Sequence, residues 1–173
     1  MGPRPFGKDQ VTIYGTLVRL GNEGILLRGD AGVGKSTAAL ELIADCGQLV
    51  ADDVVVIKRV GNMLFGTAPL ILKGILSIPE LGIFDIREVI GPDRYAPSSV
   101  ITRCVDLGSL PKAGDRDCDA EFHGIRLPRT YQKVERSHKS TVFPHGVDLL
   151  SVKESEARFF QRHRRAVAAS SAH

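Results

Sequence analysis

The 173-residue sequence contains no tryptophan, only three cysteines and no long hydrophobic run. Cys46, Cys104 and Cys118 are far apart and odd in number, and the sequence has no C-x-x-C pair. This argues against a disulfide framework and against a zinc ribbon. No apolar stretch approaches the ~20 residues that a membrane-spanning helix needs. The first ten residues, MGPRPFGKDQ, also lack the apolar segment of a secretory signal. We therefore expect a cytoplasmic protein with no membrane partner.

The charge balance and the histidine spacing exclude further classes of function. The formal net charge is only +3, which does not by itself indicate a nucleic-acid partner. Basic residues gather at 126–139 and 158–165, but no recognition motif or aromatic stacking pattern accompanies them, so we expect no nucleic-acid role. The five histidines lack the spacing of metal ligands. We interpret the acidic segment 111–121 as an exposed loop because it lacks the spacing of an EF-hand.

Composition divides the chain into one domain and two short tails. Residues 1–10, rich in glycine, proline and charge, are expected to be flexible, residues 11–168 to form a single domain, and residues 169–173 to be frayed. Gly47 is expected to end the first helix in the left-handed conformation, and Ser151 with Glu154 to form the capping box of the last. Hydropathy and turn residues predict strands at 11–20, 25–27, 48–51, 54–60, 63–65 and 100–107, and helices at 35–46, at 70–76 and from 152 onward.

Residues 29–36 read Gly-Asp-Ala-Gly-Val-Gly-Lys-Ser and match the phosphate-binding P-loop pattern G-x-x-x-x-G-K-[ST] in full. The glycines let backbone N–H groups converge on phosphate oxygens, Lys35 supplies charge at the β and γ phosphates, and the Ser36 hydroxyl can ligate Mg²⁺. A predicted strand precedes the loop and a predicted helix follows it, which favours this interpretation over a glycine-rich turn with an incidental lysine. We therefore predict that ATP and Mg²⁺ are bound by Gly29, Asp30, Ala31, Gly32, Val33, Gly34, Lys35, Ser36 and Thr37.

Asp52 and Asp53, which follow the apolar stretch 48–51, form the second candidate site. Two acids beside a buried strand are costly to hold there without a purpose. Next to a P-loop, one of them could hold the metal and the other could accept a proton from an attacking hydroxyl. We predict Asp52 and Ser36 as metal ligands and Asp53, Asp52 and Lys35 as catalytic residues. Asp53 is the preferred base, although the residues alone leave that choice open, and a plain Asp-Asp turn is the alternative.

Three segments resemble the catalytic domain of the HPr kinase/phosphorylase family: 29–43, Leu49-Val-Ala-Asp-Asp53, and Leu81-Gly-Ile83 with Gly91. The resemblance implies an α/β fold, a P-loop domain like that of phosphoenolpyruvate carboxykinase, with mixed sheets and flanking helices. It also implies ATP-dependent phosphorylation of a serine on the phosphocarrier protein HPr, reversal with inorganic phosphate, and a homo-oligomer, usually a hexamer. Many family members carry a separate N-terminal domain, and this chain resembles the short forms that lack one.

The chain departs from the family pattern at several positions. Tyr14 stands where the family has a histidine before the Gly-Thr of its opening strand, Ser77 replaces a glutamate that helps bind metal, and Pro79 replaces an arginine. Glu80 lies three positions beyond the replaced glutamate. These departures keep two alternatives open. One is a related kinase that acts on a different protein or on a small hydroxyl compound. The other is a nucleotide-binding regulatory module with weak or no catalysis.

The family's late basic loop corresponds here to 133–138. Arg136 and Lys139 could supply charge for phosphate there, since both side chains are suitable donors. A solvated basic face is the equally weighted alternative.

Overall fold

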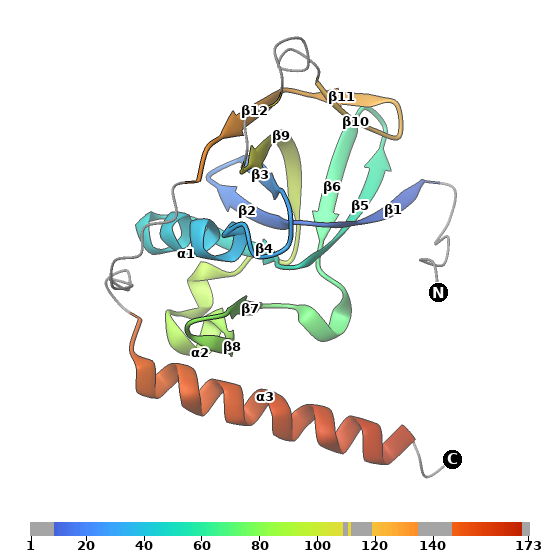
Figure 1. The fold of residues 1–173 in the computed structure, drawn as a ribbon. Coiled ribbons are helices and arrows are strands. Elements are labelled where there is room, and N and C mark those ends of the chain that lie inside the picture. The colour runs from blue at the N-terminus through green and yellow to red at the C-terminus, as the bar shows by residue number, and fades with distance from the viewer. Residues whose placement is uncertain (1–8, 109–110, 112–118, 135–146, 171–173) are drawn as a thin grey trace.

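The structure is a computed structural model that describes residues 9–108, 111, 119–134 and 147–170. It confirms an α/β fold built on a curled mixed sheet with flanking helices (Figure 1). The main sheet has eight strands: β1 (Gln10–Tyr14), β2 (Thr16–Leu20), β3 (Glu23–Arg28), β4 (Gln48–Ala51), β5 (Val54–Val60), β6 (Met63–Thr67), β9 (Ser99–Leu107) and β12 (Arg129–Gln132). The remaining elements are α1 (Lys35–Asp45), η1 (Leu70–Leu72), β7 (Ile75–Ile78), β8 (Gly82–Asp85), α2 (Ile86–Val89), η2 (Pro92–Arg94), β10 (Ala120–Phe122), β11 (Ile125–Leu127) and α3 (Leu149–Ser170).

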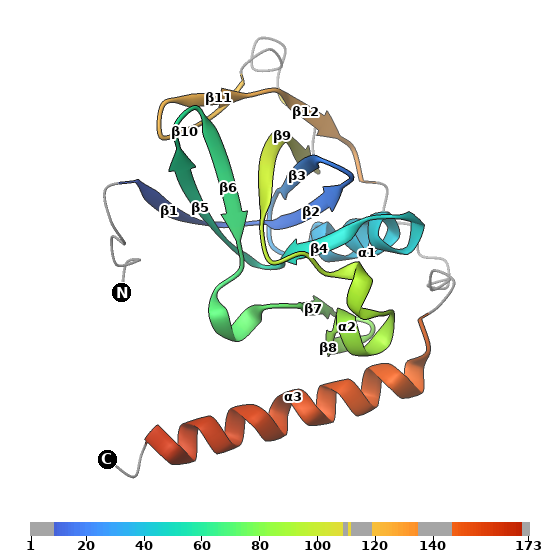
Figure 2. The same ribbon diagram turned by 180° about the vertical axis from the view of Figure 1, so that it is seen from behind.

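The strand order β1-β5-β6-β9-β3-β2-β4 places strands from opposite ends of the chain side by side. β9 runs parallel to β3 and also to β12, and the other neighbours in the sheet are antiparallel. β7 and β8 form a separate antiparallel hairpin below the main sheet and α1, and α3 lies beneath that hairpin (Figures 1 and 2). The carboxyl ends of β3 and β9 therefore meet where the P-loop begins, the end of parallel strands at which ligand sites form.

The central strands are buried on both faces because successive side chains along a strand point to opposite sides. Leu26 packs with the residues of β5 and β6, whereas its neighbours Ile25 and Leu27 pack with α1. The core on the α1 side also takes in Phe84 of the hairpin and Val152 of α3. The hairpin and α3 are thus fastened to the same core that supports the P-loop helix.

Most predicted elements are confirmed, and two are wrong. The predicted strand 11–20 is two strands, because the chain breaks at Gly15 and each half pairs with a different partner. The predicted helix 70–76 is a 3₁₀ turn over Leu70–Leu72 followed by β7. Leu70 and Ile71 are 80% and 69% exposed, so no apolar helix face is buried there. Gly74, at φ +77°, then turns the chain into the hairpin.

The ends of both long helices also differ from prediction. α1 ends at Asp45, one residue before the predicted end, and Gly47 is not in the left-handed region. Gly47 is needed for space instead, because a Cβ there would lie 2.8 Å from the Leu42 carbonyl oxygen. α3 begins at Leu149, three residues before the predicted start, because Asp148 and not Ser151 caps it. The Asp148 carboxylate accepts from the Ser151 N–H at 3.0 Å and from the Ser151 hydroxyl at 2.9 Å.

Several sequence predictions lie wholly or partly outside the described residues. They concern residues 1–8, most of the acidic segment 111–121, Arg136, Lys139 and residues 171–173. The division into a domain at 11–168 and two tails stays a prediction. Within the part of the chain that the structure describes, no helix is both long enough and apolar enough to cross a bilayer.

Glu88 of α2 joins α3 to the body of the protein. Its carboxylate accepts hydrogen bonds from Ser155 at 2.8 Å, Arg158 at 3.0 Å and Arg162 at 2.8 Å. Partial burial raises the pKa of Glu88, but these hydrogen bonds outweigh it, so the pKa lies below its ordinary value. The stabilisation is therefore complete above the unfolded-state pKa and is lost as the pH falls through the lower folded-state pKa.

We expect Glu88→Gln to lower the thermal midpoint by about 1–3 °C at pH 7, a small effect because the pairs are partly exposed. The gap between the thermal midpoints of wild type and variant should narrow as the pH falls below the ordinary glutamate pKa and Glu88 becomes protonated. Thermal unfolding at pH 7 and at pH values in this lower range measures the gap, and a gap of equal size throughout would contradict the expectation.

Candidate functional site

The P-loop connects β3 to α1 and owes its shape to glycine. Gly29, Gly32 and Gly34 have φ values of +141°, +76° and +106°, a region that side-chain-bearing residues rarely adopt. At Gly29 a Cβ would also lie 2.5 Å from the Leu107 carbonyl oxygen of β9. Gly34 caps α1, whose first turn begins with the hydrogen bond from Ala38 N–H to the Gly34 carbonyl at 2.9 Å. The loop thus presents its backbone and the helix N-terminus on one side, as an anion site requires.

Two charged side chains, one at the end of β3 and one at the start of α1, stabilise the loop through hydrogen bonds. The Arg28 guanidinium donates to both Asp106 carboxylate oxygens at 2.7 and 2.8 Å and so ties the end of β3 to that of β9. Lys35 Nζ donates to the carbonyl oxygens of Gly29 and Asp30, each at 2.9 Å. The lysine ammonium group therefore lies over the loop, where the phosphates of a nucleotide would be bound.

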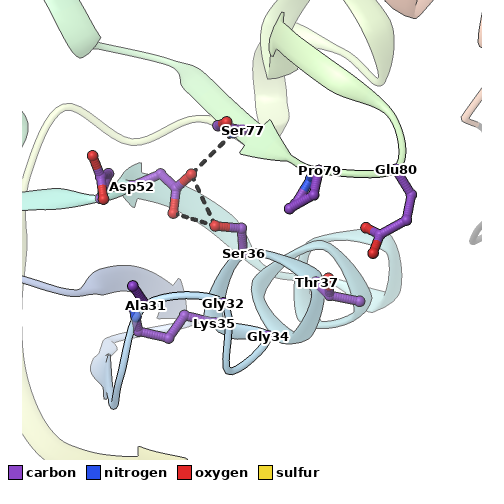
Figure 3. A pocket seen from close by; sticks show the side chains of 11 residues that line it. Ala31, Gly32, Gly34, Lys35, Ser36, Thr37, Asp52, Ser77, Pro79 and Glu80 are labelled. Carbon is purple, nitrogen blue, oxygen red and sulfur yellow. Dashed lines mark hydrogen bonds between the residues drawn. The ribbon is translucent and has the colours of Figure 1, made fainter. Parts of the chain in front are cut away.

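Asp52 is the buried acid of the site. It is 4% exposed, and its Oδ1 accepts from the Thr16 hydroxyl at 2.7 Å and from the Ser36 hydroxyl at 2.8 Å. Its Oδ2 accepts from the Ser77 N–H at 3.0 Å (Figure 3). Burial raises the pKa of Asp52 above its ordinary value, and the hydrogen bonds from Ser77, Thr16, Ser36 and the Asp53 backbone only partly offset that effect. Residues of β2, α1 and β7 therefore all donate hydrogen bonds to a single carboxylate.

Asp53 has a different environment from its neighbour. Its backbone is left-handed at φ +64°, its side chain is exposed, and its carbonyl accepts from the Gly15 N–H at 3.1 Å. This turn separates the two carboxylates. Asp52 points to Ser36, whereas Asp53 is exposed to solvent.

A cleft of about 280 Å³ brings the predicted residues together. One wall is the P-loop with the start of α1, and the other is the turn between β7 and β8, where Pro79 and Glu80 face the first turn of α1 (Figure 3). The lining residues are Ala31, Gly32, Gly34, Lys35, Ser36, Thr37, Asp52, Asp53, Ser77, Pro79 and Glu80.

Not every predicted residue lines this cleft. Gly29, Asp30 and Val33 belong to the loop but are not among the lining residues, and Val33 N–H donates to the Asp30 carbonyl at 3.2 Å within the loop itself. Tyr14, at the end of β1, is 80% exposed and is not part of the lining. Thr16 is a site residue that the sequence pattern did not predict, because its contact with Asp52 depends on how β2 pairs with β4.

The oxygen atoms around Asp52 fit Mg²⁺. The Ser36 hydroxyl and the Asp52 carboxylate lie within hydrogen-bond distance of each other, and both are the hard oxygen donors that Mg²⁺ prefers. In the described part of the chain, no three His, Cys, Asp or Glu side chains are grouped as metal ligands. In proteins, Mg²⁺ takes one or two carboxylates together with water and substrate phosphates.

The sequence matches one protein family over most of its length. The family model described as "HPr Serine kinase C-terminal domain" matches residues 8–141. Proteins named HPr kinase/phosphorylase are similar to the chain. The one from Mycoplasmopsis pulmonis is 42% identical over 98 residues, 57% of this chain and 32% of that protein. The one from Limosilactobacillus reuteri is 37% identical over 131 residues, 72% of this chain and 41% of that protein. The chain therefore spans less than half the length of these curated relatives.

The fold is similar to a solved structure described as "Structure of the Hpr(Ser) kinase/phosphatase from Coxiella burnetii". The TM-score is 0.65 with 22% sequence identity, and the match covers 94% of this chain and 95% of that one. The predicted fold class is confirmed by this match. The match also extends to α3, which lies beyond the residues of the family model.

Proposed function

Because the chain belongs to the HPr serine kinase C-terminal domain family, we propose that it is an ATP-dependent kinase that phosphorylates a serine of the phosphocarrier protein HPr. The same proposal includes the reverse direction, in which inorganic phosphate takes the phosphoryl group from phosphoserine and leaves as pyrophosphate. The observation that carries the proposal is the hydrogen bond from Ser36 of the P-loop to the buried Asp52, beside the exposed Asp53 in one cleft. A cytoplasmic location belongs to it as well, since ATP is supplied there.

Each residue of the cleft has a place in the proposed reaction. The P-loop N–H groups and the Lys35 ammonium group bind the phosphates. Ser36 and Asp52 are the residues that would hold Mg²⁺, which supplies charge neutralisation at the phosphates when bound. Asp53 accepts the proton of the serine hydroxyl as its oxygen attacks the γ-phosphorus and the bond from that phosphorus to the bridging oxygen of ADP breaks.

A homo-oligomer, a hexamer by family resemblance, is the remaining part of the proposal. Leu70 and Ile71 support it, because these two neighbouring apolar side chains are largely exposed and a second subunit would cover them. Light scattering during size-exclusion chromatography measures the mass directly.

Phosphate transfer to HPr tests the proposed function. The chain is incubated with purified HPr, Mg²⁺ and ATP labelled in the γ-phosphate, and the labelled residue is identified. Label on a serine of HPr is the expected result. Nucleotide binding without label on HPr would overturn the HPr kinase proposal. A screen for label on other proteins or small hydroxyl compounds would then separate a different kinase from a regulatory module.

Lys35→Met is expected to weaken binding of Mg·ATP by about ten- to a hundredfold. The substitution removes charge-assisted hydrogen bonds to phosphate, each worth about 1.5–3 kcal/mol. Titration calorimetry measures the affinity, and the exposed Lys58 on β5 offers the matched control Lys58→Met. Equal affinities for wild type and Lys35→Met would contradict nucleotide binding at the P-loop.

A further inference from the structure

The β7–β8 hairpin lies between the candidate site and α3. β7 carries Ser77, whose N–H reaches Asp52, and the turn that follows carries Pro79 and Glu80 into the cleft. β8 forms the far edge of the hairpin, and α3 packs along it (Figures 1 and 2). The wall of the cleft is therefore a two-stranded sheet, and among the residues that the structure describes no further strand pairs with either of its edges.

Side chains of α3 take the place of that missing strand. The Ile83 N–H donates to Glu156 Oε1 at 3.1 Å, and the Asp85 N–H donates to the Ser155 hydroxyl at 2.9 Å. These two amides are two residues apart on β8 and face the same edge, as alternate residues of a strand do. A helix that covers a strand edge in this way satisfies backbone groups that would otherwise be open.

One position of the hairpin connects Asp52 directly with α3. Ser77 and Ile83 lie opposite each other in the register of the two strands. The Ser77 N–H donates outward to Asp52, and the Ile83 N–H donates outward to Glu156. The carboxylates of Asp52 and Glu156 therefore accept hydrogen bonds at opposite edges of the hairpin, from the same pair of facing residues.

Glu156 also fixes the base of the turn that enters the cleft. At Gly82, where φ is +112°, a Cβ would lie 2.6 Å from Glu156 Oε1. The glutamate carboxylate is thus packed against the backbone of the residue that ends the turn bearing Pro79 and Glu80. Only glycine leaves room for this approach.

We propose that Glu156 is a positioning residue, which acts through the β7–β8 hairpin to hold the Ser77 N–H on Asp52 and the Pro79–Glu80 turn against the P-loop. The inference deepens the proposed function and rests on it for the reaction affected. The contact that defines it belongs to α3, outside the residues of the family model. Glu156 itself touches no reacting atom.

The test compares Glu156→Ala with Glu156→Gln and with Glu154→Ala. Glutamine keeps an oxygen acceptor for Ile83 and should rescue the site. Glu154 is on the same helix but 59% exposed, with Arg158 at 3.9 Å as its ion-pair partner, so its replacement is the matched control. Amide hydrogen exchange at Ser77 reports on the hairpin without any need for catalysis. Mg·ADP affinity and HPr phosphorylation are measured on the same proteins.

We expect Glu156→Ala to speed Ser77 exchange about tenfold, to weaken Mg·ADP binding several-fold and to lower the transfer rate about tenfold, in line with one charge-assisted hydrogen bond. The other two variants should match wild type. Faster exchange at Ile83 alone, with Ser77 unchanged, would overturn the inference. Should Glu156→Ala fail to fold, Glu156→Asp, which withdraws the carboxylate by one methylene, is judged by the same readouts. Wild-type protein that does not phosphorylate HPr would overturn the proposed function but not the exchange result.

Discussion

Replacing Asp53 with asparagine is expected to slow phosphoryl transfer by about 10²- to 10⁴-fold, the usual contribution of a general base. Asparagine has the size of aspartate but cannot take the proton of the acceptor hydroxyl. It also tolerates the left-handed backbone that Asp53 adopts at φ +64°. Folding and nucleotide affinity should therefore remain as in wild type. Single-turnover transfer at saturating ATP, together with calorimetric nucleotide titration, separates the chemical step from binding.

Two further variants make this result specific. Asp53→Ala should lose the same activity and in addition about 1–2 kcal/mol of stability, because alanine is strained in the left-handed region. Asp45→Asn, an exposed aspartate at the end of α1, should change neither. If Asp53→Asn transferred phosphate at the wild-type rate, another group would have to take the proton, and Asp52 would be the first candidate.

The P-loop is predictable from the sequence because its geometry is local. Gly29, Gly32 and Gly34 stand at the positions that need positive φ, and Lys35 and Ser36 follow them in the chain. The same holds for hairpins closed by short turns, such as the one at Gly61 between β5 and β6. Such features need only a few neighbouring residues, so composition and spacing suffice to find them.

The rest of the site depends on contacts between distant segments. Thr16 reaches Asp52 across 36 residues, through β2 and β4, whose pairing register shifts between Leu17 and Val18. Periodicity along one strand does not reveal such a shift. For residues 70–85, apolar composition without a clear period could not distinguish a helix from a hairpin. The strand edge of that hairpin is satisfied by Ser155, 70 residues beyond Asp85.

Replacing Asp52 with asparagine should separate activity from stability, because the two depend on different properties of the same side chain. The negative charge is what a metal site needs, and its loss should slow transfer by about 10²- to 10³-fold, or 3–4 kcal/mol of transition-state stabilisation. The folded protein without ligands has no such need. Burial already raises the pKa of this carboxyl, which means that the charged form is held at a cost.

An asparagine at position 52 can keep the hydrogen bonds of this side chain with Thr16, Ser36 and Ser77. Its oxygen can accept from the Ser77 N–H, and its amide can donate to the hydroxyl oxygens of Thr16 and Ser36, which rotate to accept. With the contacts kept and the buried charge removed, the free energy of unfolding should stay level or rise by up to about 1 kcal/mol. Denaturant unfolding without nucleotide or Mg²⁺ measures this.

Thr16→Val, a substitution that alters the side chain about as little, is expected to change the free energy of unfolding in the opposite direction. It removes one donor and leaves the Asp52 charge in place, so the protein should lose about 1–3 kcal/mol. Adding Mg·ADP gives a second contrast, since a ligand that binds only the folded state raises its stability. Mg²⁺ should raise the stability of wild type beyond the effect of ADP alone, but it should not raise the stability of Asp52→Asn in this way. The contrary outcome is an Asp52→Asn protein that is active and as unstable as Thr16→Val. That outcome would show that the charge of Asp52 serves the folded structure only, and that the metal site lies elsewhere in the cleft.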